Sequence, residues 1–166
     1  MPLISDATLE DLPGVLAIFN DVIARTTAVY REQPVSLEER RTWRESRLEQ
    51  GFPVLVAKDE SGVLGFASFG EFRAWPCYRN TVEHTVHVRA DARGQGIGRS
   101  LVEALLPRAQ RLGKHVMVAG IDADNAVSRR LHQQLGFLEV GRFREVGRKF
   151  NRWLDLVFMQ RLLEGP

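Results

Sequence analysis

The chain has 166 residues, a mass of 18.8 kDa and a formal net charge of +2. This length favours one domain, and we expect residues 1–166 to fold as a single unit. With 44% apolar and 27% charged residues, the composition excludes disordered and fibrous proteins. No stretch reaches the roughly 18 apolar residues of a membrane span, and no basic segment typical of a secretion signal opens the chain. We therefore expect a cytoplasmic protein.

Positive charge is concentrated in one part of the chain. Between Arg89 and Lys114, six basic residues stand against Asp91 and Glu103, which gives this segment a net charge of +4. The excess indicates either an anion-binding site or a helix with a solvated basic face. We expect no nucleic-acid partner, because that would require a longer basic stripe with interleaved aromatic residues. The lone Cys77 excludes an intramolecular disulfide and a thiolate zinc cluster.

A first helix is predicted after a short apolar start at residues 3–4. Asp11 is its expected N-cap, and Pro13 lies in its first turn. Apolar side chains then recur at helical spacing, at Leu12, Leu16, Phe19 and Ile23.

A second helix and a hairpin follow. Ser36 and Glu39, three residues apart, form a predicted capping box, and Gly51 is the expected stop of this helix. Two apolar runs, 53–57 and 63–69, are separated by a polar turn and predict an antiparallel hairpin.

The rest of the chain alternates between strands and helices. Gly113 and Gly136 are expected to end two of the helices. The predicted elements are a β-branched strand at 81–88, a glycine-rich turn at 93–98, a helix over 98–112, a strand at 115–121, a helix over 125–135, and strands at 137–140 and 153–162 around a basic loop at 142–152. This order predicts an α/β fold with a mixed sheet.

The turn Arg93-Gly94-Gln95-Gly96-Ile97-Gly98 lies between a predicted strand and a predicted helix. Unpaired main-chain amides and the positive end of the helix can hold a phosphate there. The glycines let the backbone approach closely, and Arg93 adds a fixed charge. The spacing fits neither a dinucleotide fingerprint nor a P-loop. Taken alone, such a turn is also a common tight connection.

Two linked motifs carry a resemblance to a known family. Arg93, Gly96 and Gly98 match the pattern R/Q-x-x-G-x-G/A. The pattern N-x-x-S/A-x-x-L-Y/H-x-x-x-G-F is matched by Asn125, Ser128, Leu131, His132, Gly136 and Phe137. Together they resemble the GNAT superfamily of acetyl-CoA-dependent N-acetyltransferases. Segments 81–86, 118–122, 147–150 and 153–155 resemble its phosphinothricin acetyltransferase branch, which includes relatives that acetylate methionine sulfoximine and methionine sulfone.

The resemblance implies a GNAT-type α/β (α+β) fold. Its sheet would be mixed, mostly antiparallel, flanked by helices and splayed between the strands at 81–88 and 115–121. It also implies that acetyl-CoA is the co-substrate and that the acetyl group passes to the α-amine of a small acceptor of the phosphinothricin, methionine sulfoximine or methionine sulfone type. The cofactor-binding residues would be Val86, His87, Val88, Arg93, Gly94, Gln95, Gly96, Ile97, Gly98, Arg99, Asn125 and Ser128.

Amine acetylation needs a base, and Glu83 is the candidate. Strand alternation puts Glu83, Thr85 and His87 on one face and His84 on the other. Burial in a central strand would raise the pKa of the Glu83 carboxyl toward working pH. The resemblance puts the general base at this residue, acting directly or through water. The alternative is a glutamate that pairs with an arginine such as Arg79.

The resemblance implies two further roles. A main-chain amide near Val86 to Val88 would polarise the thioester carbonyl. Where many family members have a tyrosine that protonates the thiolate, this chain has His132, which is either that acid or a packed helix residue. Asn125 contacts the pantetheine arm in the family and can equally be the N-cap of its helix.

Residues that flank the Glu83 strand are candidates for acceptor binding. An arginine pair suits a substrate carboxylate, although loop arginines are more often solvated. The candidates are Tyr30, Arg73, Tyr78, Arg79 and Lys149. Lys149, with Phe150 and Trp153, resembles a branch motif that some relatives contribute across a dimer interface, and a homodimer is the expected assembly.

No metal is expected, because His84 and His87 point to opposite faces of their strand. Two other functions stay open. A protein N-terminal acetyltransferase would need an open groove for an extended peptide. A non-catalytic acyl-CoA-binding module would have no use for a partly buried carboxylate at Glu83.

Overall fold

One mixed sheet dominates the computed structural model, which describes residues 2–164. Its strand order is β1-β2-β3-β4-β5-β7-β6. Every neighbouring pair is antiparallel except β4 and β5, which are parallel. The seven strands are β1 (Leu3–Asp6), β2 (Val54–Asp59), β3 (Gly62–Glu71), β4 (Thr81–Val88), β5 (Val116–Asp122), β6 (Leu138–Lys149) and β7 (Arg152–Leu162). The predicted mixed, mostly antiparallel sheet is confirmed.

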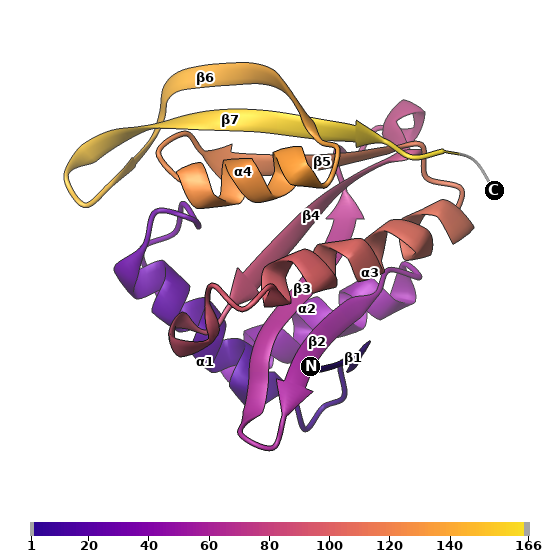
Figure 1. The fold of residues 1–166 in the computed structure, drawn as a ribbon, viewed down its shortest axis with the longest axis vertical. Coiled ribbons are helices and arrows are strands. Elements are labelled where there is room, and N and C mark those ends of the chain that lie inside the picture. Colours follow the sequence, from indigo (N-terminus) through magenta and orange to yellow (C-terminus); the bar gives the residue numbers. More distant parts are fainter. Residues whose placement is uncertain (1, 165–166) are drawn as a thin grey trace.

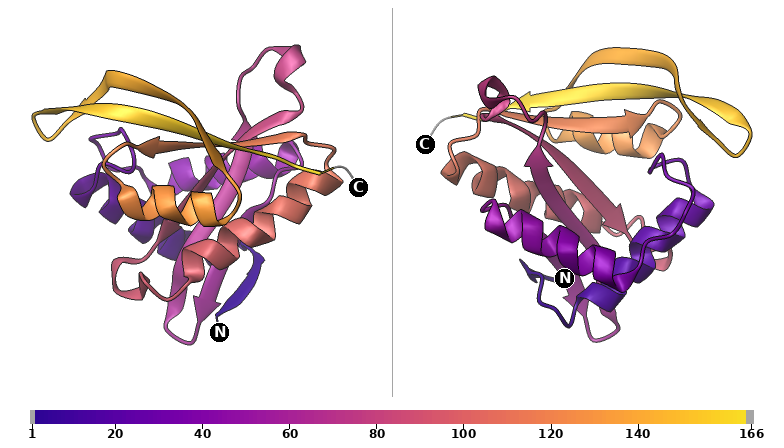
Figure 2. Two further views of the ribbon diagram at one scale, coloured as in Figure 1. Left: turned by 45° about the horizontal axis from the view of Figure 1, so that its top comes forward. Right: turned by 180° about the vertical axis from the view of Figure 1, so that it is seen from behind.

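Helices cover both faces of this sheet (Figures 1 and 2). α1 (Leu12–Arg25) and α2 (Leu37–Glu49) lie on one face, and α3 (Ile97–Arg111) and α4 (Ala126–Gln134) lie on the other. The predicted capping box of α2 is present, with a bond from Glu39 N to Ser36 Oγ and one from Ser36 N to Glu39 Oε2. None of the helices in residues 2–164 is long and apolar enough to span a membrane.

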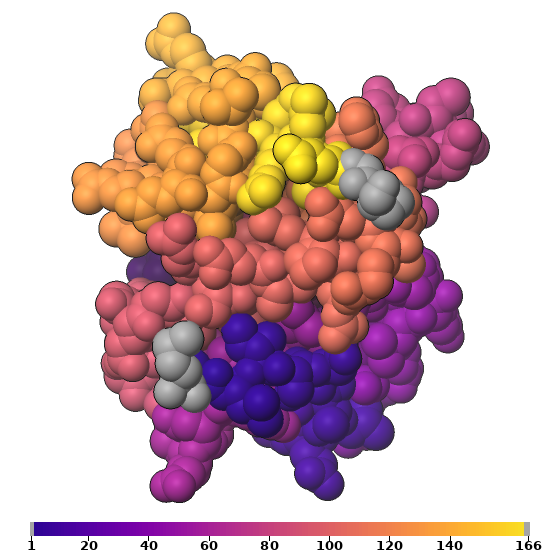
Figure 3. All heavy atoms as spheres, turned by 45° about the vertical axis from the view of Figure 1, so that its right-hand side comes forward, coloured from indigo at the N-terminus to yellow at the C-terminus, as the bar shows by residue number. Residues whose placement is uncertain are grey.

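Two apolar clusters hold the layers together. The larger one packs Leu101 and Leu105 of α3 against the sheet, and the smaller one packs α1 against β2 and β3 around Phe66. On the surface, β1 and α3 lie side by side (Figure 3), where Arg108 donates two hydrogen bonds to the Asp6 carboxylate at 3.1 and 2.9 Å. The short apolar start of the chain lies in β1, which is an edge strand of the sheet.

β4 runs over the predicted residues and has the predicted alternation. Val82 and His84 are buried on the α3 and α4 side, where His84 contacts Phe137. His87 points to the other side, toward Phe19 of α1 and Phe66 of β3.

Two details differ from the sequence prediction. Most of the predicted basic loop at 142–152 is strand, because β6 continues to Lys149 and turns at Phe150 and Asn151, both with positive φ. Asp11 is the N-cap residue of α1, as predicted, but its side chain makes no cap hydrogen bond. Its carboxylate instead accepts hydrogen bonds from Thr8 and pairs with Lys58 at 3.0 Å.

The one parallel contact in the sheet is short. β4 and β5 pair at only three positions, ending at Glu83 and Val118, and then separate. The predicted splay is confirmed, and it leaves a gap in the middle of the sheet that the functional residues can use.

Candidate active site

The main chain of β4 has unused hydrogen-bonding groups on the side of the gap. Arg89 N donates to Leu64 O of the β3 side at 2.7 Å. Since hydrogen-bonded positions alternate along an antiparallel pair, His87 is also bonded to β3, whereas the N–H groups of Val86 and Val88 point toward β5. Beyond Glu83, β5 no longer pairs with them. These two amides are therefore available to polarise a carbonyl group.

Two cavities meet at this gap. The smaller, about 300 Å³, is lined by residues of β4 and β5, including Thr85 and Asp122. The larger, about 880 Å³, extends along the glycine-rich turn at 93–99 and the start of α3. Both cavities are lined by Val86, His87, Asn125 and Ser128, among others.

The glycine-rich turn borders the larger cavity. Gly94 and Gly96 have φ of +77° and +81°, and a Cβ at either position would meet nothing within 4 Å. Gly96 is the N-cap residue of α3, so the free amides of the first helical turn face outward from this end. Arg93 is fixed beside them by a hydrogen bond from its Nε to Val88 O at 3.3 Å. The turn has the open backbone and the charge that a phosphate requires.

The second motif brings Asn125 and Ser128 to the junction of the two cavities. Asn125 Oδ1 accepts a hydrogen bond from Ser128 N at 3.1 Å and caps α4. This bond uses the side-chain oxygen and leaves the Asn125 amide nitrogen for a ligand. The cap function and the predicted cofactor contact are thus compatible.

Glu83 lies where β4 and β5 begin to separate. Its Oε1 would be 3.0 Å from a Cβ on Gly120, so the missing side chain of Gly120 makes room for the carboxylate. Burial raises the pKa of the Glu83 carboxyl, and the charge of Arg73 partly offsets that effect. Arg79, the alternative partner considered for Glu83, instead donates to Pro76 O at 3.2 Å.

His132 is paired with His84. Its Nδ1 lies 2.7 Å from Ser128 O, and its Nε2 lies 3.0 Å from His84 Nε2. A carbonyl oxygen only accepts, so Nδ1 of His132 carries the proton and its Nε2 accepts from His84. Burial lowers the pKa of both rings, to about 3 for His84 with a further contribution from His132. The pair is therefore neutral near pH 7 and joins β4 to α4.

The predicted acceptor residues divide into two groups. Arg73, Tyr78 and Arg79 lie in the exposed segment between β3 and β4. Arg73 stacks over Phe72, 4.2 Å from its ring centroid, and its charge acts on Glu83. Tyr78 packs edge-on against the same Phe72 ring. Of these three residues, only Arg73 is thus linked to Glu83, whereas Arg79 lies beside the start of β5, where its main-chain oxygen accepts a hydrogen bond from Lys114.

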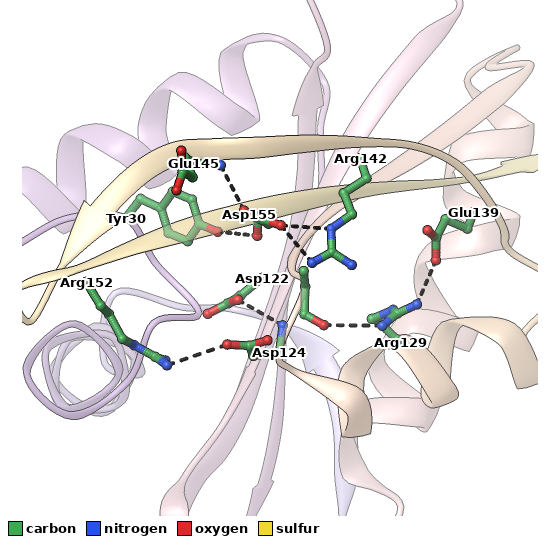
Figure 4. A network of polar contacts seen from close by, with 10 residues as sticks. Tyr30, Asp122, Asp124, Arg129, Glu139, Arg142, Glu145, Arg152 and Asp155 are labelled. Atoms are coloured by element: carbon green, nitrogen blue, oxygen red, sulfur yellow. Dashed lines mark hydrogen bonds and ion pairs between the residues drawn. The ribbon is translucent and has the colours of Figure 1, made fainter.

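Tyr30 and Lys149 form the second group and connect the segment between α1 and α2 to the β6–β7 hairpin. The Tyr30 hydroxyl donates to Asp155 O at 2.9 Å (Figure 4), and its ring packs on Gly147. Lys149, which is buried, donates from Nζ to Val29 O at 2.8 Å. Burial, together with the charge of Asp122, raises the pKa of Tyr30 to about 12. Both polar groups are bonded to the main chain, and Val29, which Lys149 holds, lines the smaller cavity.

Two residues at the gap were not predicted from the sequence. Gly120 leaves the space that Glu83 occupies, and Asp122 lines the smaller cavity at the end of β5. Val118 pairs with Glu83, and alternate residues of a strand share a face. Gly120 and Asp122 therefore lie on the same face of the sheet as Glu83. Finding them in advance would have required the β4–β5 register. Within residues 2–164, no group of three or more His, Cys, Asp or Glu side chains is arranged to hold a metal ion.

Comparison with known proteins supports the assignment that this geometry suggests. Residues 16–137 match the model of the acetyltransferase (GNAT) family. The chain belongs to this family. It is 52% identical over 158 residues to the L-methionine sulfoximine/L-methionine sulfone acetyltransferase of Pseudomonas aeruginosa, a match that covers 95% of this chain and 92% of that protein. As a member with such relatives, it is an N-acyltransferase.

Two solved structures of this family are also very similar. The phosphinothricin acetyltransferase of Sinorhizobium meliloti, solved in complex with acetyl-CoA, has a TM-score of 0.95 and 37% identity, covering 99% of this chain and 90% of its own. The ribosomal-protein-alanine N-acetyltransferase of Brucella melitensis has a TM-score of 0.95 and 49% identity, covering 97% and 99%. GNAT enzymes with this fold thus carry names that refer to different acceptors.

Proposed function

We propose that this enzyme transfers the acetyl group of acetyl-CoA to the α-amine of a small amino-acid-like acceptor, of the methionine sulfoximine, methionine sulfone or phosphinothricin type. The observation that carries the proposal is the separation of β4 and β5 directly after Glu83, which leaves free main-chain amides of β4 and the motif that begins at Asn125 around two joined cavities. The 52% identity to a methionine sulfoximine/methionine sulfone acetyltransferase supports this class of acceptor.

Acetyl-CoA fits the larger cavity. Its pyrophosphate would lie on the turn from Arg93 to Arg99, bound by the amides of Gly94, Gln95, Gly96, Ile97 and Gly98 and by the charge of Arg93. Its pantetheine arm would pass Asn125 and Ser128, which puts the thioester between β4 and β5. When bound, it supplies an activated acetyl group.

The residues of the chain would assist the transfer in two ways. Glu83 takes a proton from the acceptor's ammonium group, directly or through water, because only a neutral amine attacks the thioester. The amine attacks the carbonyl carbon, and the N–H group of Val86 or Val88 stabilises the negative charge that forms on the carbonyl oxygen. The C–S bond then breaks, and the CoA thiolate leaves and takes up a proton. Over the whole reaction, the ammonium group loses two protons, of which one ends on the thiol and one in solvent.

The acid role predicted for His132 stays a prediction. In its neutral pair with His84, the one N–H of His132 is bonded to Ser128 O. To act as an acid, the ring would first have to take up a proton, which burial opposes. His87 is neutral as well, because burial and then the charges of Arg40 and Arg93 lower its pKa to about 4.

Arg73 is the better of the two arginines for holding a substrate carboxylate, since its charge reaches Glu83 whereas Arg79 bonds to Pro76. Replacing Arg73 by leucine should raise the KM for the acceptor at least tenfold, and Arg79→Leu is the matched control. Equal activity of the wild type on an amino acid and on its decarboxylated amine would contradict carboxylate recognition.

A second acceptor class is kept because of the 49% identity to a ribosomal-protein-alanine N-acetyltransferase. A protein N-terminus needs an open groove, whereas Tyr30 and Lys149 bond the segment between α1 and α2 to the β6–β7 hairpin and close one side. A site closed on one side suits a small acceptor better than an extended peptide.

The test is a thiol-release assay with acetyl-CoA. The acceptors are L-methionine sulfone, L-methionine sulfoximine, phosphinothricin, a polyamine and a peptide that begins with alanine. We expect turnover with the amino-acid analogues and at least tenfold lower kcat/KM with the peptide. A higher kcat/KM with the peptide would favour the protein N-terminal function and contradict this proposal.

We also propose a homodimer formed through the β6–β7 hairpin. Its strands and turn expose apolar side chains, each more than half exposed: Leu138, Val140, Phe143, Val146, Phe150 and Trp153. A patch of this kind favours a protein partner, and a second copy is the expected one. Light scattering should give twice the monomer mass, and a monomer at all concentrations would contradict the dimer. The cytoplasmic location expected from the sequence stays a prediction.

A further inference from the structure

A second carboxylate faces the smaller cavity, and the chemistry proposed above does not use it. Asp122 is the last residue of β5 and is 3% exposed. It lies on the Glu83 face of the sheet, one alternate position beyond Gly120. Residues two apart on a strand are separated by about 7 Å. The Glu83 carboxylate lies over Gly120, which lines the cavity, so Asp122 is the next side chain on this face of β5 and lies at the cavity wall.

One oxygen of Asp122 has a structural task and the other has none. Oδ1 accepts a hydrogen bond from Asp124 N at 3.0 Å, which closes the turn between β5 and α4. Among the residues that the structure describes, the buried Oδ2 has no hydrogen-bond partner. A buried carboxylate oxygen without a partner is rare in folded proteins, because its lost hydration is not replaced.

The arginines near Asp122 do not pair with its carboxylate. Figure 4 shows three arginines around the end of β5, and each is paired with another carboxylate. Arg142 pairs with Asp155, Arg152 with Asp124, and Arg129 with Glu139. The three arginines that Figure 4 shows near Asp122 are thus directed to other carboxylates, and Oδ2 of Asp122 stays without a partner among the described residues.

We infer that Oδ2 of Asp122 binds the α-ammonium group of the acceptor and positions it beside Glu83. The inference rests on the proposed function and adds a specificity-determining residue to it. A cavity of about 300 Å³ accommodates the head group of an amino acid, and an ammonium group supplies both the hydrogen-bond donor and the positive charge that Oδ2 lacks. Asp122 would thereby select a protonated amine over an uncharged group of the same size.

The first test is steady-state kinetics of an Asp122→Asn variant with L-methionine sulfone. Asparagine keeps an oxygen for Asp124 N and removes the charge. Asp59→Asn is the matched control, because Asp59 is also the last residue of its strand and accepts a hydrogen bond from the main chain two residues on, Ser61 N at 2.8 Å, but lines neither cavity. We expect Asp122→Asn to raise the acceptor KM about 10- to 100-fold, the loss typical of one hydrogen bond to a charged group. The KM for acetyl-CoA and the kinetics of the control should stay within twofold of wild type.

The second test measures binding without turnover. Calorimetry in the presence of CoA compares L-methionine sulfone with its 2-hydroxy analogue, which lacks the ammonium group. Wild type should bind the amino acid at least tenfold more tightly than the analogue, and Asp122→Asn should lose most of this preference. If Asp122→Asn does not fold, Asp122→Ser replaces it, since the serine hydroxyl can also accept from Asp124 N.

An unchanged acceptor KM in Asp122→Asn, an equal rise in the control, or a wild type that binds both analogues equally would overturn the inference while the proposed function stands. Absence of turnover with every amino-acid analogue would instead contradict the proposed function. The comparison of Asp122→Asn with Asp59→Asn is then made on the polyamine or the peptide, whichever is acetylated, since both carry an ammonium group. An unchanged KM for that amine would overturn the inference, and a 10- to 100-fold rise would support it.

Discussion

At the residue scale, the site depends on small groups that leave room for larger ones. The Glu83 carboxylate occupies the space that a side chain at position 120 would take, and Phe158 and Leu156 close that space from β7. Glycine at position 120 is thus part of the arrangement that holds the proposed base, although it has no reactive group of its own.

This arrangement predicts the effect of Gly120→Ala. The added Cβ would be 3.0 Å from Glu83 Oε1, closer than ordinary contact, so the carboxylate must turn away. We expect kcat to fall at least tenfold, because a displaced base loses most of its contribution, while the affinity for acetyl-CoA stays near that of wild type. Gly141→Ala, where a Cβ meets nothing within 4 Å, is the control in the same assay. Unchanged kcat in Gly120→Ala would contradict this placement of the base.

The sequence predicted some of these residues and not others for a physical reason. Glu83 and the glycines at 94, 96 and 98 were predicted because their chemistry is visible in the local sequence. The His84–His132 bond joins residues 48 positions apart, and the places of Gly120 and Asp122 depend on the register of β5 against β4. No local pattern contains that information.

At the element scale, the start of α3 carries the proposed phosphate site. Gly96 and Gly113 lie at opposite ends of this helix, both have positive φ, and a Cβ at either would enter open space. Alanine at either position should therefore cost a similar amount of stability, about 1 to 2 kcal/mol. Only Gly96 borders the larger cavity.

We therefore expect Gly96→Ala to weaken acetyl-CoA binding at least tenfold, and Gly113→Ala to leave it within twofold of wild type. Calorimetric titration with acetyl-CoA measures both, and thermal unfolding checks that the two variants lose comparable stability. Equal affinity in the two variants would place the pyrophosphate elsewhere.

Elements were predicted well where one face is buried and poorly where none is. β4 matches its prediction because its β-branched residues alternate between two packed faces. β6 was missed beyond Val140 because most of its residues are exposed and its arginines hide the strand pattern. Propensity predicted Asp11 as the N-cap residue of α1 correctly, but it could not show that the carboxylate pairs with Lys58 and Thr8 and not with the helix amides.

At the scale of the whole molecule, the His84–His132 pair couples stability to pH. Burial, and then the charge on His132, lower the pKa of His84 from 6.5 to about 3 in the folded protein. In the unfolded chain, His84 takes up its proton near pH 6.5. The contribution of neutral His84 to the free energy of unfolding is therefore fully present above pH 6.5. It is lost as the pH falls from 6.5 toward 3.

Over that range, one such histidine makes the free energy of unfolding fall by up to about 1.4 kcal/mol per pH unit. His84→Gln should reduce this slope between pH 6 and pH 4. His115→Gln should not, because His115 is exposed and outside the pair. Urea unfolding at several pH values measures the slopes. Equal slopes for wild type and His84→Gln would show that His84 is not held neutral.

The central claim is that acetyl transfer takes place where β4 and β5 separate, with Glu83 as the base. The most direct test is the kcat of Glu83→Gln with acetyl-CoA and L-methionine sulfone at neutral pH, with Glu60→Gln in the exposed β2–β3 turn as control. Glutamine keeps the size of the side chain and cannot accept the proton, so kcat should fall by about 100-fold or more, with acetyl-CoA affinity unchanged. In wild type, the rising limb of the pH–rate profile should lie above pH 4.5, since burial raises the pKa of Glu83. Retention of more than about a third of wild-type kcat would contradict the assignment, since losing a general base costs far more.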